Sequence, residues 1–232
     1  MRVGSLFAGI GGFDLGLERA GFEIAWQVEI DPYCQRVLAK HWPHVRRYGD
    51  IRAIDWASVE PVEVLCGGFP CQDISNAGKR EGIEGKRSGL WKEFRRAICE
   101  LRPSYIFMEN VSALRSRGLS VVLADLAALG FDAEWNCIPA SAVGAPHQRD
   151  RVWILAYPTG QGPQGHRAEY ELGQGEGQMQ IGRSDWWASE PGVQRVAHGI
   201  PNRVDRLRAI GNSIVPQIAE WLGRRILAQS PL

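Results

Sequence analysis

The chain has 232 residues, 44% of them hydrophobic, which suits one compact domain with a small appended lobe. Its net charge of +1 excludes a protein whose whole surface attracts polyanions, so any nucleic-acid contact must come from local basic patches. The five cysteines lack the spacing of a metal site or a disulfide framework, and neither a charged and apolar leader nor a run of about eighteen apolar residues occurs. The sequence therefore predicts a soluble protein of a reducing, cytoplasmic compartment.

Hydrophobic periodicity predicts strands that alternate with helices through the first 157 residues. We expect strands at residues 3–8, 22–28, 62–66, 105–108, 133–138 and 152–157. Helices are expected at residues 13–20, 32–41, 90–101 and 119–129, and a last helix follows Pro216 and packs back on the sheet. Since strands that alternate with helices build parallel sheets, the pattern predicts an α/β fold with a doubly wound, mostly parallel sheet.

The alternation stops between about residues 158 and 185, where glycine and glutamine dominate. Few side chains there can build a core, so we interpret most of this segment as a surface insertion without fixed structure. Trp186 and Trp187 then provide apolar anchors. These changes divide the chain into residues 1–157, 158–200 and 201–232.

A cysteine on a sharp turn is the strongest sign of chemistry. Cys71 follows an apolar strand and the sequence Gly67-Gly68-Phe69-Pro70, in which the glycines allow unusual backbone angles and the proline fixes its own φ. Such a turn holds a thiol at the carboxyl edge of the sheet, where a nucleophile is useful. The alternative is a small buried hydrophobe, as expected for the other four cysteines.

A glycine loop after the first strand predicts a cofactor site. Residues 7–12, Phe-Ala-Gly-Ile-Gly-Gly, let a ligand approach backbone amides at a helix N-terminus. The spacing differs from the dinucleotide pattern, which leaves a less charged, adenosine-containing cofactor open. Glu29, at the end of the second strand, can accept both ribose hydroxyls, and Asp50 can accept from an adenine amino group. Their alternatives are a solvated carboxylate and a turn residue.

Further charged groups are expected at the same edge as Cys71. Glu109 ends another apolar strand, where an unpaired carboxylate is costly to bury. Arg149 and Arg151 alternate before the next strand and so point to one face, although a surface ion pair is the simpler interpretation. The five histidines have no metal-ligand pattern, so we expect no metal.

Taken in order, these motifs resemble the DNA (cytosine-5) methyltransferases of bacterial or phage type, over nearly the whole chain. The resembling segments are residues 7–12, 29, 50, 70–72, 109–111, 148–151 and 211–216. The resemblance implies a Rossmann-like fold that depends on S-adenosylmethionine, with a small recognition lobe. Residues 1–157 would bind the cofactor and carry catalysis, 158–200 would form a short target-recognition insertion, and 201–232 would pack back on the catalytic domain. The cofactor-binding residues it implies are Phe7, Gly9, Gly11, Gly12, Glu29, Asp50, Pro70, Asn212 and Ser213.

The same resemblance implies a mechanism on a cytosine rotated out of the duplex. The Cys71 thiolate adds to C6, with Arg149 and Arg151 as the groups that favour its ionisation. Protonated Glu109 donates to N3, and Arg151 holds O2. The methyl group passes from S-adenosylmethionine to C5, and loss of the C5 proton then expels Cys71.

Double-stranded DNA is the implied partner. Residues 75–88 are glycine-rich and basic, and we interpret them as a lid over DNA, with an ordinary surface loop as the alternative. The expected DNA contacts are Gln72, Lys79, Arg80, Lys86, Arg87 and Arg206. The recognition segment, about residues 157–197, is shorter than in most members, which predicts a short or relaxed recognition sequence. Its candidate base readers are Gln161, Gln164, Arg167, Arg183, Trp186 and Trp187.

The resemblance further implies a monomer that acts near the nucleoid, and it leaves a cognate restriction endonuclease open as a second partner. Cytosine-5 methylation of transfer RNA is the nearest alternative, because only the substrate differs. A catalytically inactive DNA-binding module and a dinucleotide oxidoreductase are the alternatives from other classes.

Overall fold

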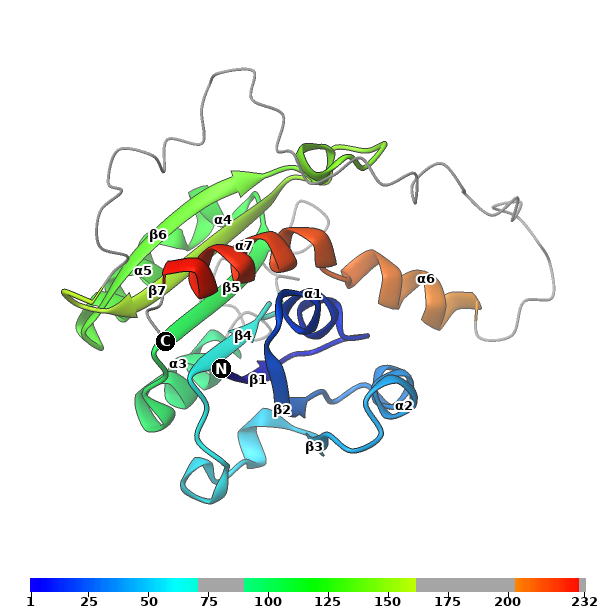
Figure 1. Ribbon diagram of the computed structural model, residues 1–232, viewed down its shortest axis with the longest axis horizontal. Helices are drawn as coiled ribbons and strands as arrows, with labels where there is room; N and C mark the ends of the chain where they lie inside the picture. Colours follow the sequence, from blue (N-terminus) through cyan, green and yellow to red (C-terminus); the bar gives the residue numbers. More distant parts are fainter. Residues whose placement is uncertain (71–89, 162–202, 230–232) are drawn as a thin grey trace.

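The computed structural model describes residues 1–70, 90–161 and 203–229 (Figure 1). The predictions for Cys71, Gln72 and residues 75–88 lie outside these ranges, as do those for the base readers from Gln164 to Trp187. The strands are β1 (Arg2–Leu6), β2 (Glu23–Val28), β3 (Arg46–Tyr48), β4 (Val64–Gly67), β5 (Tyr105–Val111), β6 (Phe131–Ile138) and β7 (Arg151–Pro158). The α-helices are α1 (Gly12–Ala20), α2 (Pro32–His41), α3 (Leu90–Leu101), α4 (Leu114–Arg117), α5 (Leu119–Ala128), α6 (Arg203–Asn212) and α7 (Pro216–Gln229).

The strands form one sheet in the order β3-β2-β1-β4-β5-β7-β6. The first five strands in this order are parallel to one another. Strand β7 runs antiparallel to both of its neighbours, β5 and β6. This arrangement confirms the predicted α/β fold with a mostly parallel sheet. The periodicity did not indicate β3, α4, α6 or three short 3-10 helices, η1 (Ile51–Ala53), η2 (Trp56–Ser58) and η3 (Ala140–Val143).

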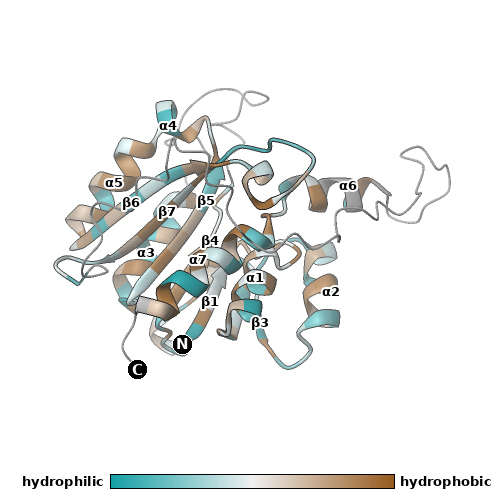
Figure 2. Ribbon diagram, turned by 45° about the horizontal axis from the view of Figure 1, so that its top comes forward, coloured by the Kyte–Doolittle hydropathy of each residue, from teal (hydrophilic) through white to brown (hydrophobic). Residues whose placement is uncertain are grey.

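Helices cover both faces of the sheet (Figure 1). On one face, Trp91, Phe94 and Ile98 of α3 pack with apolar residues of α5 and with Trp26 and Trp56. On the other face, α1 and α7 pack together over β1, β4 and β5. Hydrophilic and hydrophobic residues alternate along α7 in Figure 2, as expected for a helix with one buried face. The predicted packing of the last helix against the sheet is confirmed.

The contact between α1 and α7 depends on small residues. A Cβ atom at Gly16 would collide with the carbonyl oxygen of Pro216, and one at Gly223 would lie 2.9 Å from the Cβ of Ala20. The close approach brings residues 213–216, at the start of α7, against the first turn of α1. No helix in the described part of the chain is long and apolar enough to cross a bilayer.

Candidate active site

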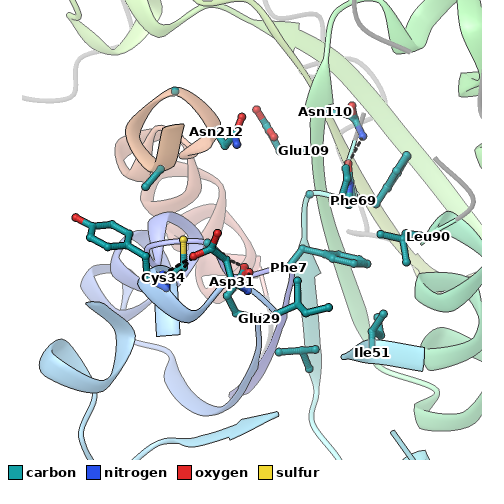
Figure 3. Close-up of a pocket in the computed structure, with 18 of the residues that line it drawn as sticks. Phe7, Glu29, Asp31, Cys34, Ile51, Phe69, Leu90, Glu109, Asn110 and Asn212 are labelled. Carbon is teal, nitrogen blue, oxygen red and sulfur yellow. Dashed lines mark hydrogen bonds between the residues drawn. The ribbon is translucent and has the colours of Figure 1, made fainter. Parts of the chain in front are cut away.

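A cavity of about 630 Å³ opens at the carboxyl edge of the sheet. Ligands of open α/β sheets bind at this edge, and the volume is ordinary for a small-molecule site. Figure 3 shows Glu29 and Asp31 in one part of the pocket and Glu109 with Asn212 in another. The predicted site residues that line it are Phe7, Gly9, Glu29, Asp50, Pro70, Glu109, Arg149, Arg151 and Asn212. The edge therefore collects most of the described residues that the sequence singled out.

The glycine loop between β1 and α1 is held open by Glu29. The two carboxylate oxygens of Glu29 accept the backbone N–H groups of Gly9, at 2.7 Å, and Asp31, at 2.8 Å. Gly9 has a positive φ of 56°, and a Cβ atom there would meet nothing within 4 Å. Burial raises the pKa of Glu29, while the two backbone hydrogen bonds act in the opposite direction. The loop thus presents an open backbone beside a fixed carboxylate.

Two other glycines of the loop serve packing. A Cβ atom at Gly11 would collide with the ring of Trp42, and one at Gly12 would lie 2.9 Å from the carbonyl oxygen of Ile214. Gly11, Gly12 and Ser213 are absent from the pocket lining, unlike the neighbouring Gly9 and Asn212. Their predicted role in cofactor binding stays a prediction.

Asp50 begins η1 and is already paired. Its carboxylate accepts the backbone N–H of Arg52 at 3.0 Å and forms an ion pair with the Arg52 guanidinium at 2.6 Å. These contacts hold the pKa of Asp50 below its usual range. Both residues line the pocket, so an adenine amino group would share the carboxylate with Arg52.

Glu109 is the buried acid of the site. Its Oε1 atom lies 3.0 Å from Nε of Arg151, which begins β7 beside the end of β5 because the two strands are antiparallel. Burial raises the pKa of Glu109 to about 7, against the opposing effect of the charges on Arg151 and Arg149. A Cβ atom at Gly68 would lie 3.2 Å from Oε2 of Glu109, so the turn after β4 passes directly over the carboxyl group. The glutamate is therefore close to half protonated at neutral pH.

The turn that leads to Cys71 is tied to β5. The side-chain amide of Asn110 donates to the carbonyl oxygen of Phe69 at 3.2 Å. Phe69 is buried and Pro70 lines the pocket, which places the end of the described turn beside Glu109. The chain then continues into Cys71.

The side chain of Arg149, which was predicted to favour ionisation of the Cys71 thiol, binds backbone carbonyls at the end of α6. Its Nη2 atom donates to the carbonyl oxygens of Gly211, at 2.9 Å, and Ser213, at 2.6 Å. Its backbone has a positive φ of 38°, an uncommon conformation for a residue with a Cβ atom. In this structure the guanidinium links the start of β7 to the junction of α6 and α7, which carries Asn212.

A buried polar cluster behind the loop was not predicted. Asp14 on α1 accepts from Ser5 Oγ at 3.0 Å and from Gln27 Nε2 at 2.7 Å, so it joins the helix to β1 and β2. Burial raises the pKa of Asp14 to about 6, although both hydrogen bonds favour the charged form. The sequence offered one sign of this cluster, which is that Asp14 lies among the apolar residues of the buried face of α1. Asp205 and Ala209 of α6 also line the pocket without having been predicted.

Comparison with known proteins decides the family. Residues 1–180 match the family model described as C-5 cytosine-specific DNA methylase. The chain belongs to this family. It is 38% identical over 164 residues to the type II methyltransferase M2.BsuMI of Bacillus subtilis, covering 67% of this chain and 42% of that protein. It is 31% identical over 217 residues to M.CviJI of Paramecium bursaria Chlorella virus IL3A, covering 93% of this chain and 56% of that protein.

Solved structures of similar fold agree with this membership. A putative DNA modification methyltransferase from a prophage of Escherichia coli superposes with a TM-score of 0.58 and 26% identity, over 68% of this chain and 47% of that one. A Spodoptera frugiperda DNMT2 mutant has a TM-score of 0.61 at 21% identity, over 72% of this chain and 53% of that one, and shows the fold alone. The chain spans about half the length of the curated relatives it matches.

Two predictions about DNA contacts stay open. Arg206 belongs to α6, but its side chain lies outside the described atoms. Gln161 is exposed in a turn after β7, away from the residues that line the pocket. Within the described residues, no group of three or more histidine, cysteine, aspartate or glutamate side chains gathers as a metal site would require.

Proposed function

We propose that the protein is a DNA (cytosine-5) methyltransferase, which transfers a methyl group from S-adenosylmethionine to C5 of a flipped cytosine. The observation that carries this proposal is the buried Glu109 with a pKa of about 7, paired with Arg151 in the same cavity as Glu29. Membership of the cytosine-specific methylase family supports the choice of base.

The residues present fit S-adenosylmethionine. Glu29 offers carboxylate lone pairs to a ribose diol, and Gly9 leaves open space above the backbone. Phe7, Ile51 and Leu90 provide apolar walls for a purine, with Asp50 at their margin. When bound, this cofactor supplies a methyl group on a positively charged sulfur, which is readily attacked by a nucleophile.

Glu109 and Arg151 are proposed to bind the cytosine ring. A protonated Glu109 can donate to N3 and accept from the exocyclic amine, a pattern that thymine cannot match. Arg151 remains positively charged and can donate to O2 while its Nε holds Glu109. Rotation of the base from the duplex costs roughly a few kcal/mol, which contacts to the base and backbone must offset.

Cys71 is the proposed nucleophile, because it directly follows Pro70 in the pocket wall. Its thiolate would form a bond to C6, and the electrons that this addition places on C5 would bond to the methyl group as the methyl–sulfur bond breaks and S-adenosylhomocysteine leaves. Water accepts the C5 proton, and the C6–S bond breaks to restore the thiolate. Arg149, although tied to residues 211 and 213, is proposed to lend positive charge to this edge.

The remaining proposals concern DNA and context. Gln72, Lys79, Arg80, Lys86, Arg87 and Arg206 are proposed to contact DNA. We also propose that the protein acts as a monomer in the cytoplasm, associates with the nucleoid and protects DNA from a cognate restriction endonuclease. The type II names of its relatives support this last point.

A trapped intermediate tests the proposed reaction. DNA that contains 5-fluorocytosine cannot lose a proton from C5, so the enzyme and S-adenosylmethionine should form a covalent adduct that resists denaturation. Cys71→Ser should abolish the adduct. The control is Cys99→Ser, which changes an exposed cysteine of α3 and should leave the adduct unchanged. Transfer RNA that contains 5-fluorocytosine serves as the second substrate. An adduct on RNA alone would replace DNA as the substrate, and no adduct on either would overturn the proposal.

A further inference from the structure

Arg96 of α3 makes contacts that reach well beyond its own helix. Its Nη2 atom donates to the carbonyl oxygen of Ile51 at 2.9 Å, and its Nη1 atom donates to that of Ile54 at 3.0 Å. Its Nε atom donates to Glu93 at 2.9 Å, which fixes the plane of the guanidinium. The guanidinium also lies 6.0 Å from the ring centre of buried Trp56. One side chain therefore binds two backbone carbonyls more than forty residues away.

The segment that Arg96 holds is part of the pocket wall. Asp50, Ile51 and Arg52 line the cavity, and they belong to a connection between β3 and β4 that contains only the short 3-10 helices η1 and η2. Backbone outside a sheet or a long helix has few hydrogen bonds of its own to fix it. The two bonds from Arg96 provide this restraint at both ends of η1.

Helix α3 contributes to the same wall directly. Its first residue, Leu90, lines the pocket, and Figure 3 shows Leu90 and Ile51 on the same side of it. The distance between these two apolar side chains determines the width of a slot for a flat ring. Arg96 sets that distance, since it joins the backbone of Ile51 to the helix that begins at Leu90.

A surface ion pair is the simpler explanation of a helical arginine, and Arg95 is an example. Arg95 is nearly half exposed and lies 3.5 Å from Asp125. Arg96 is less exposed, and its hydrogen bonds to uncharged carbonyls would be unnecessary for an ion pair with Glu93. The two neighbours therefore differ in a way that an experiment can use.

We propose that Arg96 is a positioning residue for the adenosine end of the cofactor, because it holds Asp50 and Ile51 at the correct distance from Leu90. This inference rests on the cofactor part of the proposed function and is independent of the methyl acceptor. Arg96 does not line the pocket, so it acts through the backbone of η1 and not by contact with the ligand.

Cofactor affinity measured by calorimetry, without DNA, tests the inference. Arg96→Met keeps the aliphatic stem and removes every donor, so it should weaken S-adenosylmethionine binding roughly tenfold. Arg96→Lys can reach only one carbonyl and should weaken binding by an intermediate factor. Arg95→Met is the matched control and should bind as the wild type does. 5′-Methylthioadenosine, which lacks the amino-acid end, should lose affinity by the same factor as the whole cofactor.

Steady-state kinetics separate positioning from general damage. At saturating cofactor, kcat of Arg96→Met should stay within about twofold of wild type, while KM for S-adenosylmethionine rises. The inference would be overturned if both Arg96 variants fold and bind S-adenosylmethionine with wild-type affinity. If Arg96→Met does not fold, the cofactor affinity of Arg96→Lys tests the inference by itself. If the wild type binds the cofactor but methylates no nucleic acid, the proposed function fails, and the binding data still decide the role of Arg96. No cofactor binding by the wild type would overturn both.

Discussion

At the scale of single residues, Glu109 links the stability of the fold to its chemistry. Burial beside the turn at Gly68 disfavours the carboxylate, and Arg151 only partly offsets this effect. The folded protein therefore holds a proton on Glu109 at a pH where the unfolded chain has lost it. A carboxyl group poised near neutrality can donate to a ring nitrogen as negative charge develops there.

The raised pKa of Glu109 predicts that the free energy of unfolding depends on pH. Because the pKa of Glu109 is raised in the folded state, from 4.5 to about 7, its contribution is fully present below pH 4.5 and is lost as the pH rises toward 7. The shift corresponds to roughly 3 kcal/mol. Glu109→Gln has no carboxyl group to titrate. The free energy of unfolding of the variant, relative to that of wild type, should therefore rise by this amount between pH 4.5 and pH 8. Urea denaturation at both pH values measures it.

The control for this prediction is Glu93→Gln, which removes a carboxylate of α3 that is about a quarter exposed and pairs with Arg96. Its stability difference from wild type should change little over the same range. A difference between Glu109→Gln and wild type that is equal at pH 4.5 and pH 8 would mean that folding does not raise the pKa of Glu109. The methyl-transfer rate of Glu109→Gln should also fall, by roughly 10²–10⁴-fold.

At the scale of elements, the sequence predicted most strands and helices but not all their directions. The β1-loop-α1 unit and Glu29 were predicted because hydrophobic period, glycines and a strand-end acid are local signals. The reversal of β7 was not, since a buried strand has the same apolar pattern in either direction. That reversal is what brings Arg151 to the carboxyl end of β5, so the expectation that Arg151 points to this edge had no structural basis in the pattern alone.

The residues that sequence reasoning missed share one property. Asp14, Arg96 and the carbonyl partners of Arg149 are joined across 9 to 64 residues of chain. Such pairs form only when elements pack, and single-sequence periodicity carries no information about them. Pro70 and Glu109 were easier to place at one edge, because each lies close to the carboxyl end of a strand and those strands, β4 and β5, are neighbours in the sheet.

The packing of α1 on α7 predicts a steric requirement at Gly16. Gly16→Val would drive a branched side chain into the carbonyl of Pro216 and the Cβ of Ala219, and should destabilise the fold by about 1–3 kcal/mol or more. Thermal unfolding of the variant measures the loss. Gly49→Ala is the control, since the nearest atom to its new Cβ lies 3.9 Å away on a side chain. An equal midpoint for Gly16→Val and wild type would show that the two helices separate freely.

At the scale of the whole molecule, α6 lines one part of the pocket at the edge of the sheet. Residues 211 and 213 accept from Arg149, and Ile214 packs on Gly12 at the start of α1. Residues 211–214 therefore contact both the glycine loop and the segment that leads into β7. A substitution at this junction should affect cofactor and base binding together.

The last prediction concerns sequence specificity, which the proposed enzyme must obtain from few residues. Only residues 159–202 separate β7 from α6, and this segment is rich in glycine and glutamine. Each well-formed pair of hydrogen bonds to a base edge contributes about 1–3 kcal/mol of discrimination, so few rigid readers specify few bases. We expect methylated sites, mapped by sequencing DNA from cells that express the protein, to share a short or degenerate sequence. Arg183→Ala and Trp186→Ala should relax it further, whereas Lys79→Ala should weaken binding equally at all sites and reduce its salt dependence. A long, fully specified site would mean that base reading resides elsewhere than in this segment.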